Sequence, residues 1–196
     1  MLPLLYTHLI YALTFVLVVG AWASSELLGP VRWSGLREGK KQDRGSTPVS
    51  LIVGLSGLVL CFLLPVLVPG ATITWQPGAF FVGLAVMLVG VSWRWYAIVT
   101  LGTYFTGEIV IQAQHVVVQH GPYKFVRHPS YSGAFLIAIG IGLMVGSWLS
   151  IVTIIAGFVV GMIYRIPAEE QALLQALGQP YEMYMKRTKR LIPFIF

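Results

Sequence analysis

Long apolar stretches with almost no charged side chains dominate this chain and decide what it can fold into. The mean hydropathy is +0.79. Only 10% of the residues are charged, whereas about a quarter are charged in a typical soluble domain. So few charges cannot cover the surface of a water-soluble globule. The sequence therefore predicts an integral membrane protein, and its 196 residues suit a single domain, 1–196.

The apolar stretches predict an all-α fold with about five transmembrane helices. Three are expected in the N-terminal half, at residues 4–28, 48–68 and 78–101, because a bilayer core is crossed by roughly 20 helical residues. Residues 130–164 predict a hairpin of two shorter helices, about 17 residues each, that turns near Gly146.

The positive charges indicate how the chain crosses the membrane. Five basic residues lie between residues 32 and 44, two follow the third span, and four lie between residues 186 and 190. Basic residues concentrate on the cytoplasmic side, so we expect the N-terminus outside and the C-terminus in the cytoplasm. The first span is expected to be retained, because no basic residue precedes it as in a secretory signal. Because the basic residues lie next to the apolar runs, the net charge of +6 indicates attraction to anionic membrane lipids and not binding of nucleic acid.

Glycines are expected to bring the hairpin helices close together. Gly142 and Gly146 are four residues apart on the first helix, and Gly157 and Gly161 have the same spacing on the second. Small residues at this spacing let membrane helices approach closely. The alternative is that these glycines are scattered by chance in a glycine-rich membrane protein.

Arg94 lies among aromatic residues, in Trp93-Arg94-Trp95-Tyr96, towards the end of the third span. This pattern predicts an interfacial aromatic belt with an arginine that extends towards the lipid headgroups. In the alternative, Arg94 points inward to a ligand carboxylate.

Two β-branched runs interrupt the helical pattern after the third span. Ile109-Val110-Ile111 and Val116-Val117-Val118 are too short to span a bilayer and are separated by polar residues. We expect extended segments on the cytoplasmic face, with backbone groups available to a ligand.

The tail, residues 167–196, is predicted to be an amphipathic cytoplasmic segment. Leu173, Leu174 and Leu177 share one helical face, Gly178 is expected to end that helix, and Pro180 suits the first turn of the next one.

Ionisable groups flank the predicted hairpin on both sides. Arg127 and His128 precede it, and Arg165, Glu169 and Glu170 follow it. If the two helices are antiparallel, both clusters return to the same side of the bilayer and can share a site. Charged residues at membrane depth are candidates for function; the alternative is a stabilising interfacial ion pair, since residues 165 and 169 are one helical turn apart.

The segments around the hairpin resemble those of the isoprenylcysteine carboxyl methyltransferase family and its membrane phospholipid methyltransferase relatives. The resemblance rests on GPYKFVRHPSYSG, the apolar hairpin, the double Glu and LGQPYEMYMKRTKRLIP, over about residues 115–193. It implies methyl transfer from S-adenosylmethionine to the carboxylate of a prenylated cysteine, with residues 102–196 as the cofactor-binding catalytic region and residues 1–101 as the N-terminal spans.

The resemblance also implies roles for individual residues. Arg165 and Glu169 match the proposed catalytic pair of the family. Ala168 stands where relatives often extend the acidic run, so the roles of Glu169 and Glu170 could be exchanged. The residues implied to surround the cofactor are His115, Val117, Val118, Gly121, Tyr123, His128, Tyr131 and Glu170.

The chemistry agrees with these roles. A methyl sulfonium is already activated, so the enzyme mainly aligns a nucleophile with it and excludes water. Arg165 can hold a substrate carboxylate by two parallel contacts while Glu169 fixes the guanidinium. The prenyl chain is expected to enter from the bilayer and the cofactor from the cytoplasm, with no metal required.

Three other functions are compatible with the sequence. The chain could methylate phospholipids or other small molecules at the same cofactor site. It could be a membrane reductase of the sterol-reductase type that binds NADPH. It could also be a non-enzymatic membrane scaffold whose paired motifs only pack the hairpin.

Overall fold

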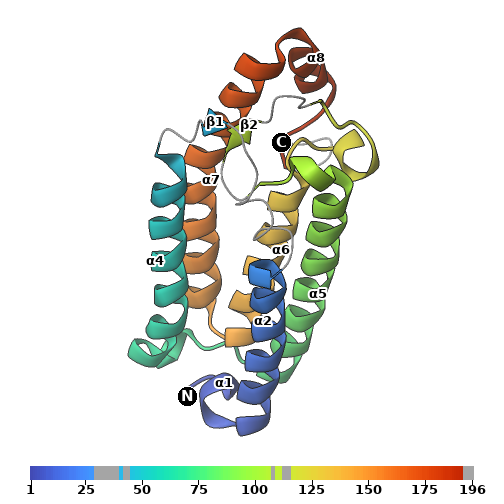
Figure 1. Cartoon of the computed structure of the whole chain (residues 1–196). Helices are drawn as coiled ribbons and strands as arrows, with labels where there is room; N and C mark the ends of the chain where they lie inside the picture. The colour runs from blue at the N-terminus through green and yellow to red at the C-terminus, as the bar shows by residue number, and fades with distance from the viewer. Residues whose placement is uncertain (29–39, 42–44, 107–108, 112–115, 192–196) are drawn as a thin grey trace.

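The protein is a bundle of helices that run between two ends of the molecule (Figure 1). The computed structural model describes residues 1–28, 40–41, 45–106, 109–111 and 116–191. The helices are α1 (Leu4–Thr7), α2 (Leu9–Leu28), α4 (Ser46–Leu67), α5 (Gln76–Leu101), α6 (Pro129–Val145), α7 (Trp148–Leu177) and α8 (Gln179–Arg187). Short 3₁₀ turns cover Pro69–Ala71, Gly102–Tyr104 and Gly121–Lys124, and β1 (Lys40–Lys41) pairs antiparallel with β2 (Val110–Ile111).

Four of the described helices are long and apolar enough to cross a membrane: Leu9–Glu26, Ser46–Leu67, Gln76–Tyr104 and Trp148–Leu177. α6 is also apolar and has 17 residues, which is at the lower limit for a span. The predicted all-α membrane fold is therefore confirmed. The side of the membrane on which each terminus lies stays a prediction.

The last helix of the predicted hairpin is longer than expected. The sequence predicted a hairpin over residues 130–164 and a separate tail from residue 167, and this division is wrong, because α7 continues from Trp148 through Pro167 to Leu177. Buried neighbours on both sides of the proline, Ile166 and Glu170, pack the helix into the protein. Proline inside a helix costs about 3 kcal/mol, so the packing of these neighbours has to offset a strong local preference. The residues on both sides of Pro167 consequently project from one continuous helix.

Other boundaries follow the sequence closely. Gly178 ends α7 with φ of +61°, and Pro180 lies in the first turn of α8, as predicted. The first predicted span is divided at His8, whose extended backbone separates α1 from α2. Val110–Ile111 forms a short strand as expected, and residues 116–118 are described without regular structure.

Glycines do bring helices together, but mostly between α6 and α5 and between α7 and α4. A Cβ atom added to Gly140 would lie 2.6 Å from the carbonyl oxygen of Gly83, and one added to Gly157 would lie 3.0 Å from the Cα of Gly57. Only part of the predicted packing within the hairpin is found, since a Cβ on Gly142 would lie 2.9 Å from the Cα of Ile151.

The hairpin turn lies at the end of the bundle opposite α8 (Figure 1). Gly146 ends α6 with φ of +81°, a conformation that favours glycine. The core includes Phe80, Met87, Ile141 and Met144, all buried. This packing leaves the beginning of α6 and the later turns of α7 as the polar end of the hairpin.

Candidate functional site

A cavity of about 420 Å³ lies at the polar end of the bundle. α2, α4, α5, α6, α7 and α8 contribute to its wall, together with the segment at residues 116–118. Part of the wall is apolar, with Leu51, Met162 and Leu173 among its residues. Its ionisable and phenolic side chains are those of Glu26, Arg94, Tyr104, Tyr123, Arg127, His128, Tyr131, Arg165, Glu169, Tyr181 and Tyr184.

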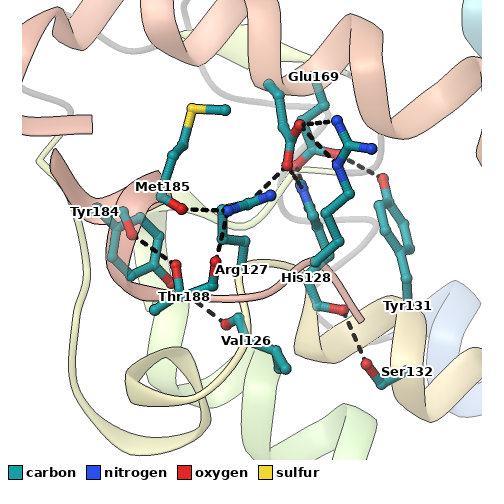
Figure 2. A network of polar contacts seen from close by, with 11 residues as sticks. Val126, Arg127, His128, Tyr131, Ser132, Glu169, Tyr184, Met185 and Thr188 are labelled. Carbon is teal, nitrogen blue, oxygen red and sulfur yellow. Dashed lines mark hydrogen bonds and ion pairs between the residues drawn. The ribbon is translucent and has the colours of Figure 1, made fainter. Parts of the chain in front are cut away.

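The two ionisable clusters meet at this end of the α6–α7 hairpin, as the sequence predicted. The His128 Nε2 lies 3.3 Å from Glu170 Oε1, and the Tyr131 hydroxyl donates a hydrogen bond of 2.7 Å to Glu169. Pro129 lies in the first turn of α6 and disfavours a helical backbone at His128, whose φ and ψ are −123° and 59°. Because α7 remains helical past Pro167, its carboxylates reach back to the start of α6 (Figure 2).

Tyr131 links Arg165 to Glu169. Its hydroxyl accepts a hydrogen bond of 3.2 Å from Arg165 Nε while it donates to Glu169. Arg165 also contacts the hydroxyl of Thr47 on α4. Figure 2 shows the Tyr131 ring directed towards Glu169, and the ring stacks on His128 at 5.6 Å between centroids. The arginine is thus held from two helices with its side chain in the cavity wall.

Glu170 has a different environment from its neighbour Glu169. Its carboxylate accepts contacts from Arg127 at 2.8 Å and from Arg190 at 3.0 Å, besides the contact with His128. Only 5% of its side chain is exposed, compared with 28% for Glu169. Glu169 lines the cavity, whereas Glu170 lies behind the wall among cationic groups.

Residues 188–191, called here the C-terminal strap, are bound to the start of α6. The backbone N–H groups of Arg127 and His128 donate to the carbonyls of Lys189 and Arg190 at 2.8 and 3.0 Å. The Arg127 guanidinium donates to the carbonyls of Met185 and Thr188, both at 2.7 Å (Figure 2). The strap therefore fixes Arg127 and His128 from the side opposite the cavity.

Buried phenols form another part of the wall. The Tyr184 hydroxyl donates to the carbonyl of Tyr123 at 2.7 Å. Burial raises the pKa of Tyr123, Tyr181 and Tyr184. These side chains consequently stay neutral and act as hydrogen-bond donors over the ordinary pH range.

Arg94 is turned into the bundle. Its guanidinium pairs with Glu26 at 2.5 Å and donates to the carbonyl of Ser130 at 3.2 Å. Only 15% of each side chain of the pair is exposed, so the predicted extension of Arg94 towards lipid headgroups is wrong. The alternative, in which Arg94 faces a ligand, stays a prediction, because both residues line the cavity.

Most residues singled out from the sequence share this cavity. Its wall contains Val117, Val118, Tyr123, His128, Tyr131, Arg165 and Glu169. Glu170 supports the wall from behind, and Gly121, with φ of +58°, packs against Thr100. His115 lies outside the described residues. Among the described residues, no group of three or more His, Cys, Asp or Glu side chains could hold a metal ion.

Two residues of the cavity wall from the N-terminal half, Glu26 and Thr47, were not predicted from the sequence. Glu26 could have been identified as a candidate site residue, because it is the single acidic residue among residues 1–28 and lies in an apolar span. Thr47 could not have been identified, since a threonine near the start of a helix usually has a structural role.

Comparisons with known proteins find similarity over the same region. A sequence model of the isoprenylcysteine carboxyl methyltransferase (ICMT) family matches residues 82–175. A probable protein-S-isoprenylcysteine O-methyltransferase of Oryza sativa subsp. indica is 38% identical over 117 residues, which cover 59% of this chain and 61% of the relative. Protein-S-isoprenylcysteine O-methyltransferase A of Arabidopsis thaliana is 34% identical over 132 residues, 66% of either protein.

A solved structure is also similar. It is described as the eukaryotic intramembrane Ras methyltransferase ICMT without a monobody, with a TM-score of 0.61 and 32% identity. The match covers 76% of this chain and 53% of that chain. The chain thus spans less than two thirds of the length of these relatives.

Proposed function

We propose that this chain, which belongs to the isoprenylcysteine carboxyl methyltransferase family, transfers a methyl group from S-adenosylmethionine to the α-carboxylate of a C-terminal isoprenylated cysteine. The observation that carries the proposal is the cavity in which Arg165 and Glu169 are joined through Tyr131. The names of the relatives support the choice of a prenylated cysteine as the acceptor.

The chemistry of the cavity wall fits S-adenosylmethionine. The Glu169 carboxylate can face the positive charges of this cofactor, and the buried Tyr123 supplies a phenol donor and an aromatic face. The backbone of Val117 and Val118 offers donors and acceptors in a segment without regular structure. His128 and Tyr131 stack at the beginning of α6 and complete the polar side. Bound there, S-adenosylmethionine supplies a methyl group already activated on a sulfonium.

Arg165 is proposed to hold the carboxylate of the acceptor. A guanidinium matches a carboxylate by two parallel hydrogen bonds, which fixes its orientation as well as its charge. Tyr131 and Thr47 contact this guanidinium from two helices, so its direction is set before the substrate arrives. Since the acceptor is already ionised, no general base is needed, and Glu169 acts through Tyr131 on the position of Arg165.

The apolar part of the wall suits a lipid-like acceptor. Leu51 on α4 and Met162 on α7 belong to membrane-spanning helices, and Leu173 continues the apolar surface towards α8. A prenyl chain dissolved in the bilayer would reach the cavity between helices, while the cofactor enters from the cytoplasmic side. On this proposal the chain is one catalytic domain, in which residues 102–196 bind the cofactor and the N-terminal spans complete the wall.

The test is a methyl-transfer assay with the purified protein in liposomes and radiolabelled S-adenosylmethionine. We expect transfer to N-acetyl farnesylcysteine, giving a base-labile methyl ester, and none to phosphatidylethanolamine. Transfer to phosphatidylethanolamine alone would replace the proposal with a phospholipid methyltransferase. Binding of NADPH without binding of S-adenosylmethionine would favour a reductase, and a lack of both activities would overturn the enzyme proposal.

A further inference from the structure

A second hollow, of about 830 Å³, lies between α5, α6 and α7. Met162 lines both this hollow and the catalytic cavity, so α7 forms a wall between them. The residues that line it are Val89, Trp93, Ser132, Phe135, Leu136, Phe158, Val159, Met162, Ile163, Ile166, Pro167, Arg190 and Leu191. We call it the apolar groove, because all but Ser132 and Arg190 have largely apolar side chains.

The groove faces the region that a bilayer would occupy. Val89 and Ile163 are each 61% exposed, and both lie in helices long and apolar enough to cross a membrane. Side chains of this kind are in contact with acyl chains when the protein is in a bilayer. A groove between them can hold one such chain more closely than a flat helix surface.

The groove meets a basic pocket at its polar end. This pocket, of about 340 Å³, is lined by Arg127, Met185, Lys186, Arg187, Thr188, Lys189 and Arg190. Arg190 lines both hollows. Arg187 and Lys189 are exposed, and they lie on either side of the buried Thr188.

Arg190 is held in position between the two hollows. It contacts Glu170 at 3.0 Å on the protein side, and its side chain remains 37% exposed. The strap that carries it is bound to the start of α6 through the backbone of Arg127 and His128. The junction of the apolar groove with the basic pocket is therefore a fixed part of the fold.

We propose that the apolar groove and the basic pocket together bind one anionic glycerophospholipid. An acyl chain occupies the groove, and the phosphate contacts Arg187, Lys189 and Arg190. Apolar burial and attraction between basic residues and anionic headgroups act together in such sites. The groove does not contain Arg165 or Glu169, so this site goes beyond the proposed methyl transfer and does not depend on it.

The test measures lipid retention by native mass spectrometry of the purified full chain, without a methyl donor. The probes are dioleoyl phosphatidylglycerol and dioleoyl phosphatidylcholine. We expect the wild type to retain phosphatidylglycerol preferentially. The double variant Arg187→Gln/Lys189→Gln should bind it about tenfold or more weakly, because each basic residue at a lipid surface contributes several-fold in affinity. Lys124→Gln removes an exposed charge elsewhere and should leave retention unchanged.

Filling the groove separates this site from general attraction to anionic lipid. Val159→Trp should reduce the retention of both lipids, whereas Val152→Trp, on an exposed part of the same helix outside the groove, should not. If only the charge variants lower retention, a surface effect replaces the proposed site. If none of the variants lowers it, or if N-acetyl farnesylcysteine displaces phosphatidylglycerol, the proposal is overturned, and displacement would assign the groove to the methyl acceptor.

Discussion

Two neighbouring carboxylates on α7, Glu169 and Glu170, face two different regions of the molecule. On the cavity side, Glu169 is 28% exposed and accepts a hydrogen bond from Tyr131, which also contacts Arg165. On the strap side, Glu170 is 5% exposed and is surrounded by Arg127, His128 and Arg190. The two residues are adjacent and of the same type, so the difference in their exposure and partners comes from the elements that pack around α7.

The difference separates a group that can meet a ligand from a group that holds the wall in place. A carboxylate with several cationic partners is stabilised as an anion and is costly to move, because each partner would lose its counter-charge. Glu169, which accepts from the Tyr131 hydroxyl and has the His128 Nδ1 at 3.9 Å, lies on the more open side and can take part in binding. The polar end of the hairpin therefore has an adaptable half around Glu169 and a fixed half around Glu170. Single substitutions can distinguish the two halves.

The largest effect is expected on the cavity side, from Arg165→Gln. The variant loses the planar cation that is proposed to orient the acceptor carboxylate, so kcat/KM for N-acetyl farnesylcysteine should fall by about 100-fold or more. Initial rates with radiolabelled S-adenosylmethionine measure it. Arg165→Lys is the matched control, which keeps the charge without the two-pronged geometry and should recover only part of the rate. Unchanged kcat/KM in Arg165→Gln would remove Arg165 from the site.

The largest effect on stability is expected on the strap side, from Glu170→Gln. It leaves Arg127 and Arg190 around a neutral amide, and removal of one partner of a buried ion pair costs about 3–5 kcal/mol. Thermal unfolding in detergent, followed by tryptophan fluorescence, should show a much lower Tm. Glu169→Gln is the matched control, with the same substitution one residue away on the more exposed side. Equal Tm values for the two variants would contradict the division into two halves.

Tyr131→Phe tests the link between Arg165 and Glu169 inside the adaptable half. Hydrogen bonds to charged groups contribute about 1.5–3 kcal/mol, so the loss of this hydroxyl should lower kcat by roughly 10-fold to 100-fold. The stacked ring remains, and the Tm should change much less than in Glu170→Gln. A change in Tm without a change in kcat would show that the hydroxyl only supports packing.

The sequence predicted those features of the fold that single residues or composition determine. The apolar runs predicted the membrane helices, and Gly178 and Pro180 predicted the junction between α7 and α8. The antiparallel hairpin was also enough to predict that His128 would approach the acidic pair, because two short helices must return to the same end.

The sequence could not show which partner each residue finds across the bundle. Glu169 and Glu170 are the same residue type, and their side chains point about 100° apart around the helix axis. Only the elements that surround α7 decide which of them faces the cavity and which faces the strap. Arg94 resembled an interfacial arginine until the acidic partner 68 residues away was known. The continuation of α7 through Pro167 depends on the burial of Ile166 and Glu170 against other parts of the chain, which the local sequence does not show.

The smallest effect is expected from Glu182→Gln on α8, which sharpens the comparison by placing the same carboxylate in water. Glu182 pairs with Lys186 at 2.7 Å, and both side chains are more than half exposed. Its hydrogen bond to Lys186 lowers the pKa of Glu182, so any stabilisation by the pair is present at neutral pH and is lost as the pH falls through that lowered value.

Water and salt screen an exposed pair almost completely. The Tm of Glu182→Gln should therefore match the wild type at pH 7 in 150 mM salt, a buffer at roughly physiological ionic strength, and stay equal on acidification. A drop comparable to that of Glu170→Gln would show that charge alone, and not its burial among cations, stabilises this end of the protein.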